Sequence, residues 1–116
     1  MSYRMDYQDA CFTYIEEIVE LEIERADTEI LRELHSLFNI KGTELDAVRV
    51  GKKQIPKIKL EIALEKFDKR DGCWEEIKKS KPIWIKTEKD VEKKLRPILE
   101  DMQLAASICD FVHHHC

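Results

Sequence analysis

The sequence predicts a mostly α-helical fold with a small β-hairpin and long helices at both ends. Apolar residues recur at helical spacing over long stretches near each terminus, and two short segments rich in tryptophan and isoleucine follow Gly72. The composition agrees, because 38% of the residues are charged and the chain holds only three glycines and three prolines. A chain of 116 residues is the size of one domain, so residues 1–116 are expected to form a single domain.

The first predicted helix covers residues 5–25, where acidic side chains separate apolar ones at helical spacing. Asp27 and Thr28 then place two capping residues side by side. The helix therefore either stops and restarts there or runs on to Phe38. Its apolar stripe comprises Tyr7, Cys11, Tyr14, Ile15, Ile18, Val19 and Ile23, and the continuation adds Ile30, Leu31, Leu34, Leu37 and Phe38.

A short helix is predicted over residues 43–50, TELDAVRV. Thr43 can cap its start, and Asp46 occupies the acidic position of a capping box. Gly51 fits its C-terminal stop, because glycine readily adopts the conformation that ends a helix. A helix of two turns fits these boundaries.

Residues 54–72, QIPKIKLEIALEKFDKRDG, fit two incompatible periods. Strict alternation of apolar and charged side chains predicts a half-buried strand, whereas apolar spacing by threes and fours predicts a helix. Pro56 is well placed in the first turn of a helix, and good helix formers dominate residues 57–69. These features favour a helix that ends at Gly72, and a strand over residues 57–65 remains the alternative.

The segments CWEEIKK and PIWIKT after Gly72 are separated by the polar break SKP, which predicts two strands joined by a tight turn. Thr87 followed by Asp90 marks the start of the last helix, whose apolar face continues nearly to the end of the chain. Pro97 is expected to kink this helix or to restart it.

The net charge of −4 is distributed unevenly along the chain. Residues 1–45 hold four basic against eleven acidic residues, residues 46–86 hold twelve against seven, and residues 87–116 hold four against six. The middle segment is therefore a basic island between acidic flanks. Such asymmetry indicates an anionic partner, although a solvated basic face without a partner produces the same pattern.

From about Glu29 to Leu95 the chain resembles a winged-helix DNA-binding domain of the kind found in small bacterial and archaeal repressors. EILRELHSLF matches the first helix, TELDAVRV and IPKIKLEIALEKFDKRDG match the helix-turn-helix pair, and CWEEIKKSKPIWIKTEKDVEKKL matches the wing and exit helix. The connection GKKQ departs from the family pattern, because it lacks a capping serine or threonine before the recognition helix. The resemblance implies a winged helix-turn-helix core over residues 29–95.

The resemblance further implies a non-enzymatic protein that binds double-stranded DNA and regulates transcription. The recognition helix would enter the major groove, and the wing would meet the DNA backbone. Lysines supply sequence-independent affinity by releasing counterions, while Gln54 is the clearest donor to a base edge. The implied nucleic-acid-binding residues are Lys52, Lys53, Gln54, Lys57 and Lys59 on the helix, extended by Lys66, and Lys78, Lys79 and Lys81 on the wing.

The flanking helices predict a homodimer. Residues 5–27 and 97–115 carry a larger apolar surface than one small domain can cover, so a second copy is expected to cover the rest. A single recognition helix also gives weak specificity, and a dimer compensates for it by reading two DNA half-sites. The alternative is a helical protein–protein interaction or adaptor module that binds no nucleic acid. In that alternative the exposed anchors come from Tyr7, Tyr14, Trp74 and Trp84.

The tail CDFVHHHC is the candidate for a metal site. Cys109 and His113 lie four residues apart on one helical face, and Cys116 or His115 completes a ligand set that suits zinc. No second cysteine or histidine pair stands upstream, and a frayed terminus or an added tag explains three consecutive histidines equally well. The sequence therefore predicts no cofactor.

Catalysis has little support in the sequence, which lacks a glycine-rich phosphate loop, a nucleophile elbow and a metalloprotease motif. His35 is expected in the core between Leu34 and Leu37, and Cys73 beside Arg70 is the candidate nucleophilic thiol. No apolar run approaches a membrane span, and the start has no signal-peptide pattern. We therefore expect a cytoplasmic protein whose cysteines are reduced thiols.

Overall fold

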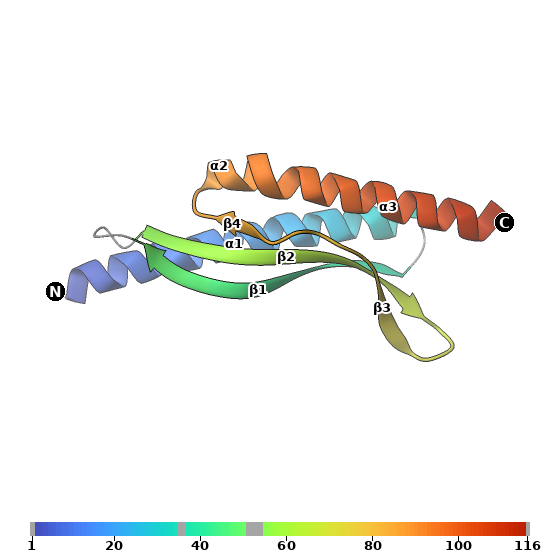
Figure 1. Cartoon of the computed structure of the whole chain (residues 1–116), viewed down its shortest axis with the longest axis horizontal. Coiled ribbons are helices and arrows are strands. Elements are labelled where there is room, and N and C mark those ends of the chain that lie inside the picture. Colours follow the sequence, from blue (N-terminus) through green and yellow to red (C-terminus); the bar gives the residue numbers. More distant parts are fainter. Residues whose placement is uncertain (1, 35–36, 51–54, 116) are drawn as a thin grey trace.

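Figure 1 shows a computed structural model of the chain, which describes residues 2–34, 37–50 and 55–115. In these residues a long helix is followed by four strands and a second helical run. The elements are α1 (Ser2–Leu34), β1 (Phe38–Val50), β2 (Ile55–Asp68), β3 (Cys73–Lys79), β4 (Ile83–Ile85), α2 (Glu88–Asp90), the π-helical turn η1 (Val91–Leu95) and α3 (Arg96–His115).

The strands form one antiparallel sheet with β2 in the middle. β1 pairs along one side of β2, and β3 and β4 pair one after the other along its second side. Ser80 closes the gap between β3 and β4: its N–H donates to the Ile62 carbonyl at 2.8 Å, and its Oγ accepts from the Ile62 N–H at 3.0 Å. β3, Ser80 and β4 therefore form one interrupted edge strand along β2. Pro82 is tolerated at this edge because it has no N–H to donate.

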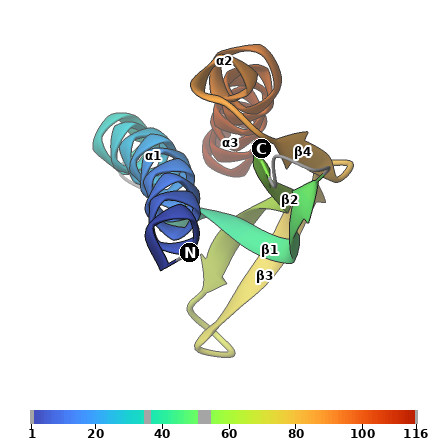
Figure 2. The same cartoon turned by 90° about the vertical axis from the view of Figure 1, so that its left-hand side faces the viewer.

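The helices α1 and α3 lie side by side on one face of the sheet, as Figure 2 shows. Arg96 Nη2 donates to Glu22 Oε1 at 3.3 Å, and Gln103 Nε2 donates to Glu29 Oε2 at 3.2 Å. Both pairs are separated by 74 residues, so the two helices run parallel. The fold is a two-layer α/β sandwich, and helices cover only one face of the sheet.

The core lies between the sheet and the two helices. From Ile58 to Leu64 every second side chain of the central strand β2 is buried there, because a strand directs alternate side chains to opposite faces. Burying one such aliphatic side chain stabilises the fold by about 1.5–3 kcal/mol. The core comprises Ile15, Val19, Ala26 and Ile30 from α1, Phe38 and Ile40 from β1, Ile58, Leu60, Ile62 and Leu64 from β2, Ile85 from β4, Val91 and Leu95 from η1, and Leu99, Met102 and Ala106 from α3.

The predicted fold class, mostly α-helical with a winged helix-turn-helix core, is wrong. The segments assigned to the helix-turn-helix pair, residues 43–50 and 55–72, contribute instead to the paired strands β1 and β2. Helix propensity in β2 is a weak preference, and burial of its alternate apolar side chains under two helices overrides it. Pro56 is accommodated near the start of the strand, opposite Arg49. The described residues therefore contain no recognition helix.

The predicted hairpin after Gly72 is wrong in its pairing. The segments CWEEIKK and PIWIKT do contain strands, β3 and β4, but both strands pair with β2 and not with each other. Gly72 itself has a φ of 67°, a left-handed conformation that favours glycine, and it lies in the turn between β2 and β3. The tight turn therefore precedes CWEEIKK, and the polar break SKP continues along the sheet edge.

Helix α1 continues through Asp27 and Thr28 instead of stopping at them. The Asp27 carboxylate accepts the N–H of Ile40 at 3.2 Å, and Thr28 Oγ1 donates to the Glu24 carbonyl at 2.9 Å within the helix. Burial raises the pKa of Asp27, and the hydrogen bond from Ile40 opposes part of that shift. Asp27 thus satisfies a backbone donor on the edge strand β1, which helps to protect that edge from pairing with another chain.

The last helical run passes Pro97 without a break. Asp90 Oδ2 accepts the N–H groups of Lys86 at 2.9 Å and Thr87 at 3.2 Å, which fixes the start of the run. The π-helical turn η1 ends at Leu95, two residues before the proline, and the Arg96 N–H bonds to the carbonyl of Val91. The turn η1 is wider than an α-helical turn and therefore leaves room for the Pro97 ring, which would clash with the backbone of a regular α-helix.

Two carboxyl groups meet where α1 crosses β1. Glu16 and Glu44 line one small cavity with Glu20. Burial raises the pKa of Glu16, and the nearby charges of Glu44 and Glu20 and a side-chain hydrogen bond with Glu44 raise it further. The folded state therefore favours protonated Glu16. Its contribution to stability is largest below the ordinary glutamate pKa and is lost as the pH rises through the raised pKa.

Replacing Glu16 with glutamine is expected to increase the free energy of unfolding at neutral pH, because the amide removes the repulsion and keeps the hydrogen-bonding capacity. The decrease in the free energy of unfolding between acidic and neutral pH should be smaller for Glu16→Gln than for the parent protein. Urea denaturation across that pH range measures both effects. Glu17→Gln, at the exposed neighbouring position, is the control. Equal stability of Glu16→Gln and the parent at neutral pH would contradict the expected repulsion.

Candidate nucleic-acid interface

The face of the sheet turned away from the helices, here called the open face, carries the side chains that alternate with the core. On β2 these side chains begin with Lys57 and Lys59. Residues directly opposite each other in an antiparallel pair share a face, so the pairing places Trp84, Lys79 and Trp74 on the open face as well. Figure 2 shows that no helix covers this face.

Two lysines and one tryptophan form a cluster at the β4 end of the open face, here called the lysine–tryptophan patch. The Lys57 ammonium lies 4.3 Å from the centroid of the Trp84 ring, and the Lys59 ammonium lies 5.8 Å from it. These are cation–π distances, so the ring holds both ammonium groups on this face. The Lys94 ammonium donates to the Trp84 carbonyl at 3.1 Å, which ties the patch to the helical layer.

The ammonium groups of the patch have no ion-pair partner among the residues that the structure describes. Among the described residues, no carboxylate oxygen lies within 4.0 Å of the Lys57 or Lys59 nitrogen. Asp46 stands directly opposite Lys59 in the register, yet its carboxylate accepts the N–H of Ala47 at 2.9 Å. Two half-exposed positive charges on a central strand therefore have no countercharge in contact among the described residues.

Two further lysines lie across the middle of the open face. Lys41 of β1 and Lys79 of β3 stand on either side of Ala63 of β2, and both are exposed. Lys79 is paired with Glu61 at 3.0 Å, and the hydrogen bond and charge of that carboxylate raise the pKa of Lys79. Lys41 has no such partner among the described side chains, so it extends the positive surface of the patch.

The remaining predicted residues are not part of the patch. Lys78 points to the helical side and pairs with Asp101 of α3 at 2.7 Å, while Lys66 lies 5.6 Å from the Phe38 ring centroid. Lys81 is exposed in the segment between β3 and β4. Lys52, Lys53 and Gln54 lie outside the described residues. The predicted set is thus reduced to Lys57 and Lys59, with Lys79 farther along the same face.

The opposite end of the open face is acidic and aromatic. Glu65 and Glu76 stand directly opposite each other, and like charges in this arrangement repel. Beyond them the rings of Phe67 and Trp74 meet edge to face with centroids 5.5 Å apart, and Trp74 is 45% exposed. An anionic ligand is therefore attracted to the β4 end, whereas the β3 end offers a ring surface.

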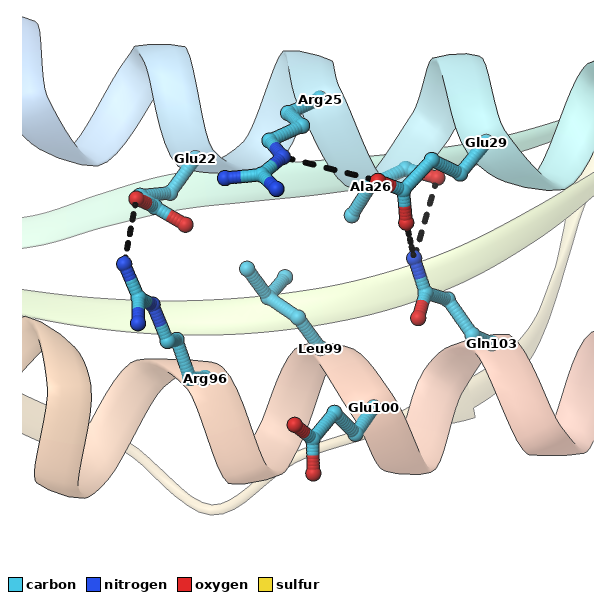
Figure 3. A pocket seen from close by; sticks show the side chains of 8 residues that line it. All are labelled: Glu22, Arg25, Ala26, Glu29, Arg96, Leu99, Glu100 and Gln103. Carbon is cyan, nitrogen blue, oxygen red and sulfur yellow. Dashed lines mark hydrogen bonds and ion pairs between the residues drawn. The ribbon is translucent and has the colours of Figure 1, made fainter.

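A cleft of about 230 Å³ lies between α1 and α3, and Figure 3 shows the side chains that line it. Four of its charged side chains form ion pairs, Arg96 with Glu22 and Arg25 with Glu29 at 3.5 Å, and Gln103 donates to Glu29. These contacts join or support the two helices. The polar side chains of the cleft therefore link the two helices, and both of its guanidinium groups are engaged in ion pairs.

The structure assembles no group of metal ligands from the residues that it describes. No three histidine, cysteine, aspartate or glutamate side chains among them are placed to hold a metal ion. Cys109 is half-buried on α3, while the side chain of His113, and both His35 and Cys116, lie outside the described residues. Cys73 is an exposed thiol at the start of β3.

Comparisons with known proteins find no match: no protein-family model, no curated protein and no solved structure is matched by this chain. None of the described helices combines the length and the apolar character that crossing a membrane requires.

Proposed function

We propose that this protein binds nucleic acid without acting as an enzyme and holds the phosphate backbone on the open face of the sheet. The observation that carries the proposal is the lysine–tryptophan patch. Lys57 and Lys59 share one face, are held beside Trp84 and have no carboxylate within contact distance among the described residues. Ammonium groups that lack an ion-pair partner among the described residues can bind phosphate oxygens. Each lysine then displaces counterions from the nucleic acid, and their release favours binding.

The distribution of charge between the two layers favours the open face over the helices as the place where a polyanion binds. Residues 1–45 carry a strong excess of acidic residues and supply α1, so the outer helical layer disfavours a polyanion. Three lysines of the open face have no ion-pair partner among the described residues: Lys57 and Lys59 lie at the β4 end, and Lys41 lies across the middle. Three phosphate contacts give a modest, salt-sensitive affinity. We further propose transcription regulation in the cytoplasm as the role of this binding.

The experiment that tests the proposal is fluorescence anisotropy of labelled oligonucleotides, titrated with the protein over a series of salt concentrations. Mixed-sequence duplex DNA and single-stranded DNA are compared, because the predicted partner was double-stranded. Three contacts predict a slope of log affinity against log salt of roughly −2 for a single strand and about −2.7 for a duplex. Absence of binding to both ligands at low salt would exclude the proposal.

A second candidate function is protein–protein interaction through α3, with a second copy of this chain as the partner. Leu104, Ile108 and Phe111 recur at helical spacing and are 59%, 56% and 62% exposed on the side of α3 away from the core. An apolar stripe of this kind is the surface that an isologous helix pair would cover. This candidate retains the predicted homodimer and is compatible with nucleic-acid binding on the opposite face.

Replacing Leu104 and Ile108 together with lysine is expected to convert a dimer into a monomer, because four buried charges would meet at the two-fold interface. Light scattering coupled to size-exclusion chromatography measures the mass. Leu21→Lys is the matched control, since Leu21 is 64% exposed on the outer side of α1. A monomeric parent protein at every concentration, or a double variant that still dimerises, would contradict the assignment to α3.

A further inference from the structure

Both tryptophans of the chain lie on the open face. The sequence contains two tryptophans, Trp74 and Trp84, and the strand register places them opposite Phe67 and Lys59 of β2. Trp84 is half-buried beneath the two lysine heads, and Trp74 is 45% exposed at the far end. A face that carries both of the largest aromatic side chains, together with unneutralised lysines, offers rings as well as charge to a ligand.

The rings and the lysines lie along one line. Lys59 and Phe67 are eight residues apart on β2, a span of about 26 Å at the usual rise of a strand. Ala63 lies midway between them and is flanked by Lys41 and Lys79. A chain that follows β2 from the lysine–tryptophan patch therefore passes a second pair of lysines before it reaches Trp74.

The position of the patch disfavours groove reading of a duplex. The major groove admits an α-helix or a two-stranded ribbon, but Lys57 and Lys59 lie on the middle strand. At Lys59 this strand has β1 on one side and β4 on the other. In a duplex the bases stack on each other and cannot reach Trp84 or Trp74. An unpaired strand leaves its bases free to stack on aromatic side chains.

We propose that the ligand is single-stranded nucleic acid, which lies along β2 with its phosphates on the lysines and its bases stacked on Trp84 and Trp74. The inference rests on the proposed function and narrows its substrate class. The Lys57 and Lys59 ammonium groups leave the Trp84 ring for the adjoining phosphates when a base takes their place. Glu65 and Glu76 keep phosphates away from the sheet near Trp74, so only a base reaches that ring.

The test uses the intrinsic tryptophan fluorescence of the full chain. A thymidine strand of about 12 nucleotides, an abasic strand of the same length and a duplex are titrated in turn at constant salt. The thymidine strand should quench the tryptophan emission and bind at least about tenfold more tightly than the abasic strand, because stacking adds to the phosphate contacts. The abasic strand carries the same phosphates and is therefore the control for charge.

Two variants assign the quenching to the rings. Trp84→Leu and Trp74→Leu should each lower affinity for the thymidine strand by about fivefold or more while leaving affinity for the abasic strand within about twofold. Trp74 is the more exposed, so its variant keeps the test valid if Trp84→Leu does not fold. Equal affinity for all three ligands would overturn the single-strand inference and leave the proposed function standing. Absence of binding to any ligand would overturn both.

Discussion

Replacing Lys57 and Lys59 together with glutamate is expected to lower the affinity for nucleic acid by more than about tenfold. Among the described residues, three ammonium groups of the open face lack an ion-pair partner, and the double variant removes two of them and puts carboxylates where phosphates would bind. The salt dependence should also become shallower, by roughly 1.4 in the slope for a single strand, because two phosphate contacts are lost. Anisotropy titrations over a salt series measure both quantities.

The matched control reverses two lysines on the helical layer. Lys89 of α2 and Lys93 of η1 are exposed, and Lys89→Glu with Lys93→Glu changes the net charge by the same amount. The control variant should retain most of the affinity, because its lysines do not lie on the open face. Equal losses in the two double variants would show that total charge governs binding and that the lysine–tryptophan patch is not the site.

Replacing Leu64 with alanine is expected to lower the free energy of unfolding by about 2–5 kcal/mol, the largest stability effect predicted here. Leu64 has 0% exposure and lies on the central strand β2, beneath the helices. Alanine removes apolar contacts from a site that two layers enclose, and the surrounding side chains can fill the cavity only in part. Urea denaturation with a constant m-value measures the change.

The control for this prediction is the next residue along the same strand. Glu65 lies on the open face opposite Glu76, so Glu65→Ala should change stability by no more than about 0.5 kcal/mol or increase it slightly. A large difference between neighbouring positions is the signature of a strand with one buried face. Comparable losses at both positions would contradict the assignment of β2 as a half-buried strand.

The sequence predicts that residues 54–72 are amphipathic, but it does not decide whether their apolar side chains follow the period of a strand or of a helix. Alternation of Ile58, Leu60 and Ile62 with charged residues was visible, and Pro56 and the helix-forming composition pointed the other way. The deciding interaction is not local, because β2 gains its hydrogen bonds from β1 on one side and from β3 and β4 on the other. A local pattern cannot show which distant segment completes a sheet.

Residues 43–50 illustrate the same limit. Thr43 and Asp46 have the spacing of a capping box, yet the Asp46 carboxylate accepts the N–H of the adjacent residue, Ala47, within an extended strand. A helix start and an exposed strand with polar side chains share these residue types. Where the whole signal was local, as at Thr87 and Asp90, the start of the last helical run lay where the capping residues indicated it.

The predicted role of Lys57 and Lys59 depends on a helix that the structure replaces with the strand β2. On the predicted helix, residues two apart would point about 200° away from each other, whereas on a strand they share one face. The same alternation separates Lys78 from Lys79 and sends Lys78 to Asp101. Trp84 and Lys41 escaped the predicted site because only the register of β4 and β1 against β2 brings them to this face.

The most direct test of the open face as the binding site is a set of amide NMR spectra of isotope-labelled protein, recorded as a single-stranded oligonucleotide is added. The largest shifts should fall on β2 from Lys57 to Glu61, on β4 around Trp84 and on β1 around Lys41, with the Trp84 indole N–H among them. The outer sides of α1 and α3 should stay unchanged. Shifts confined to the helices, or no shifts at low salt, would contradict the proposal that this face binds nucleic acid.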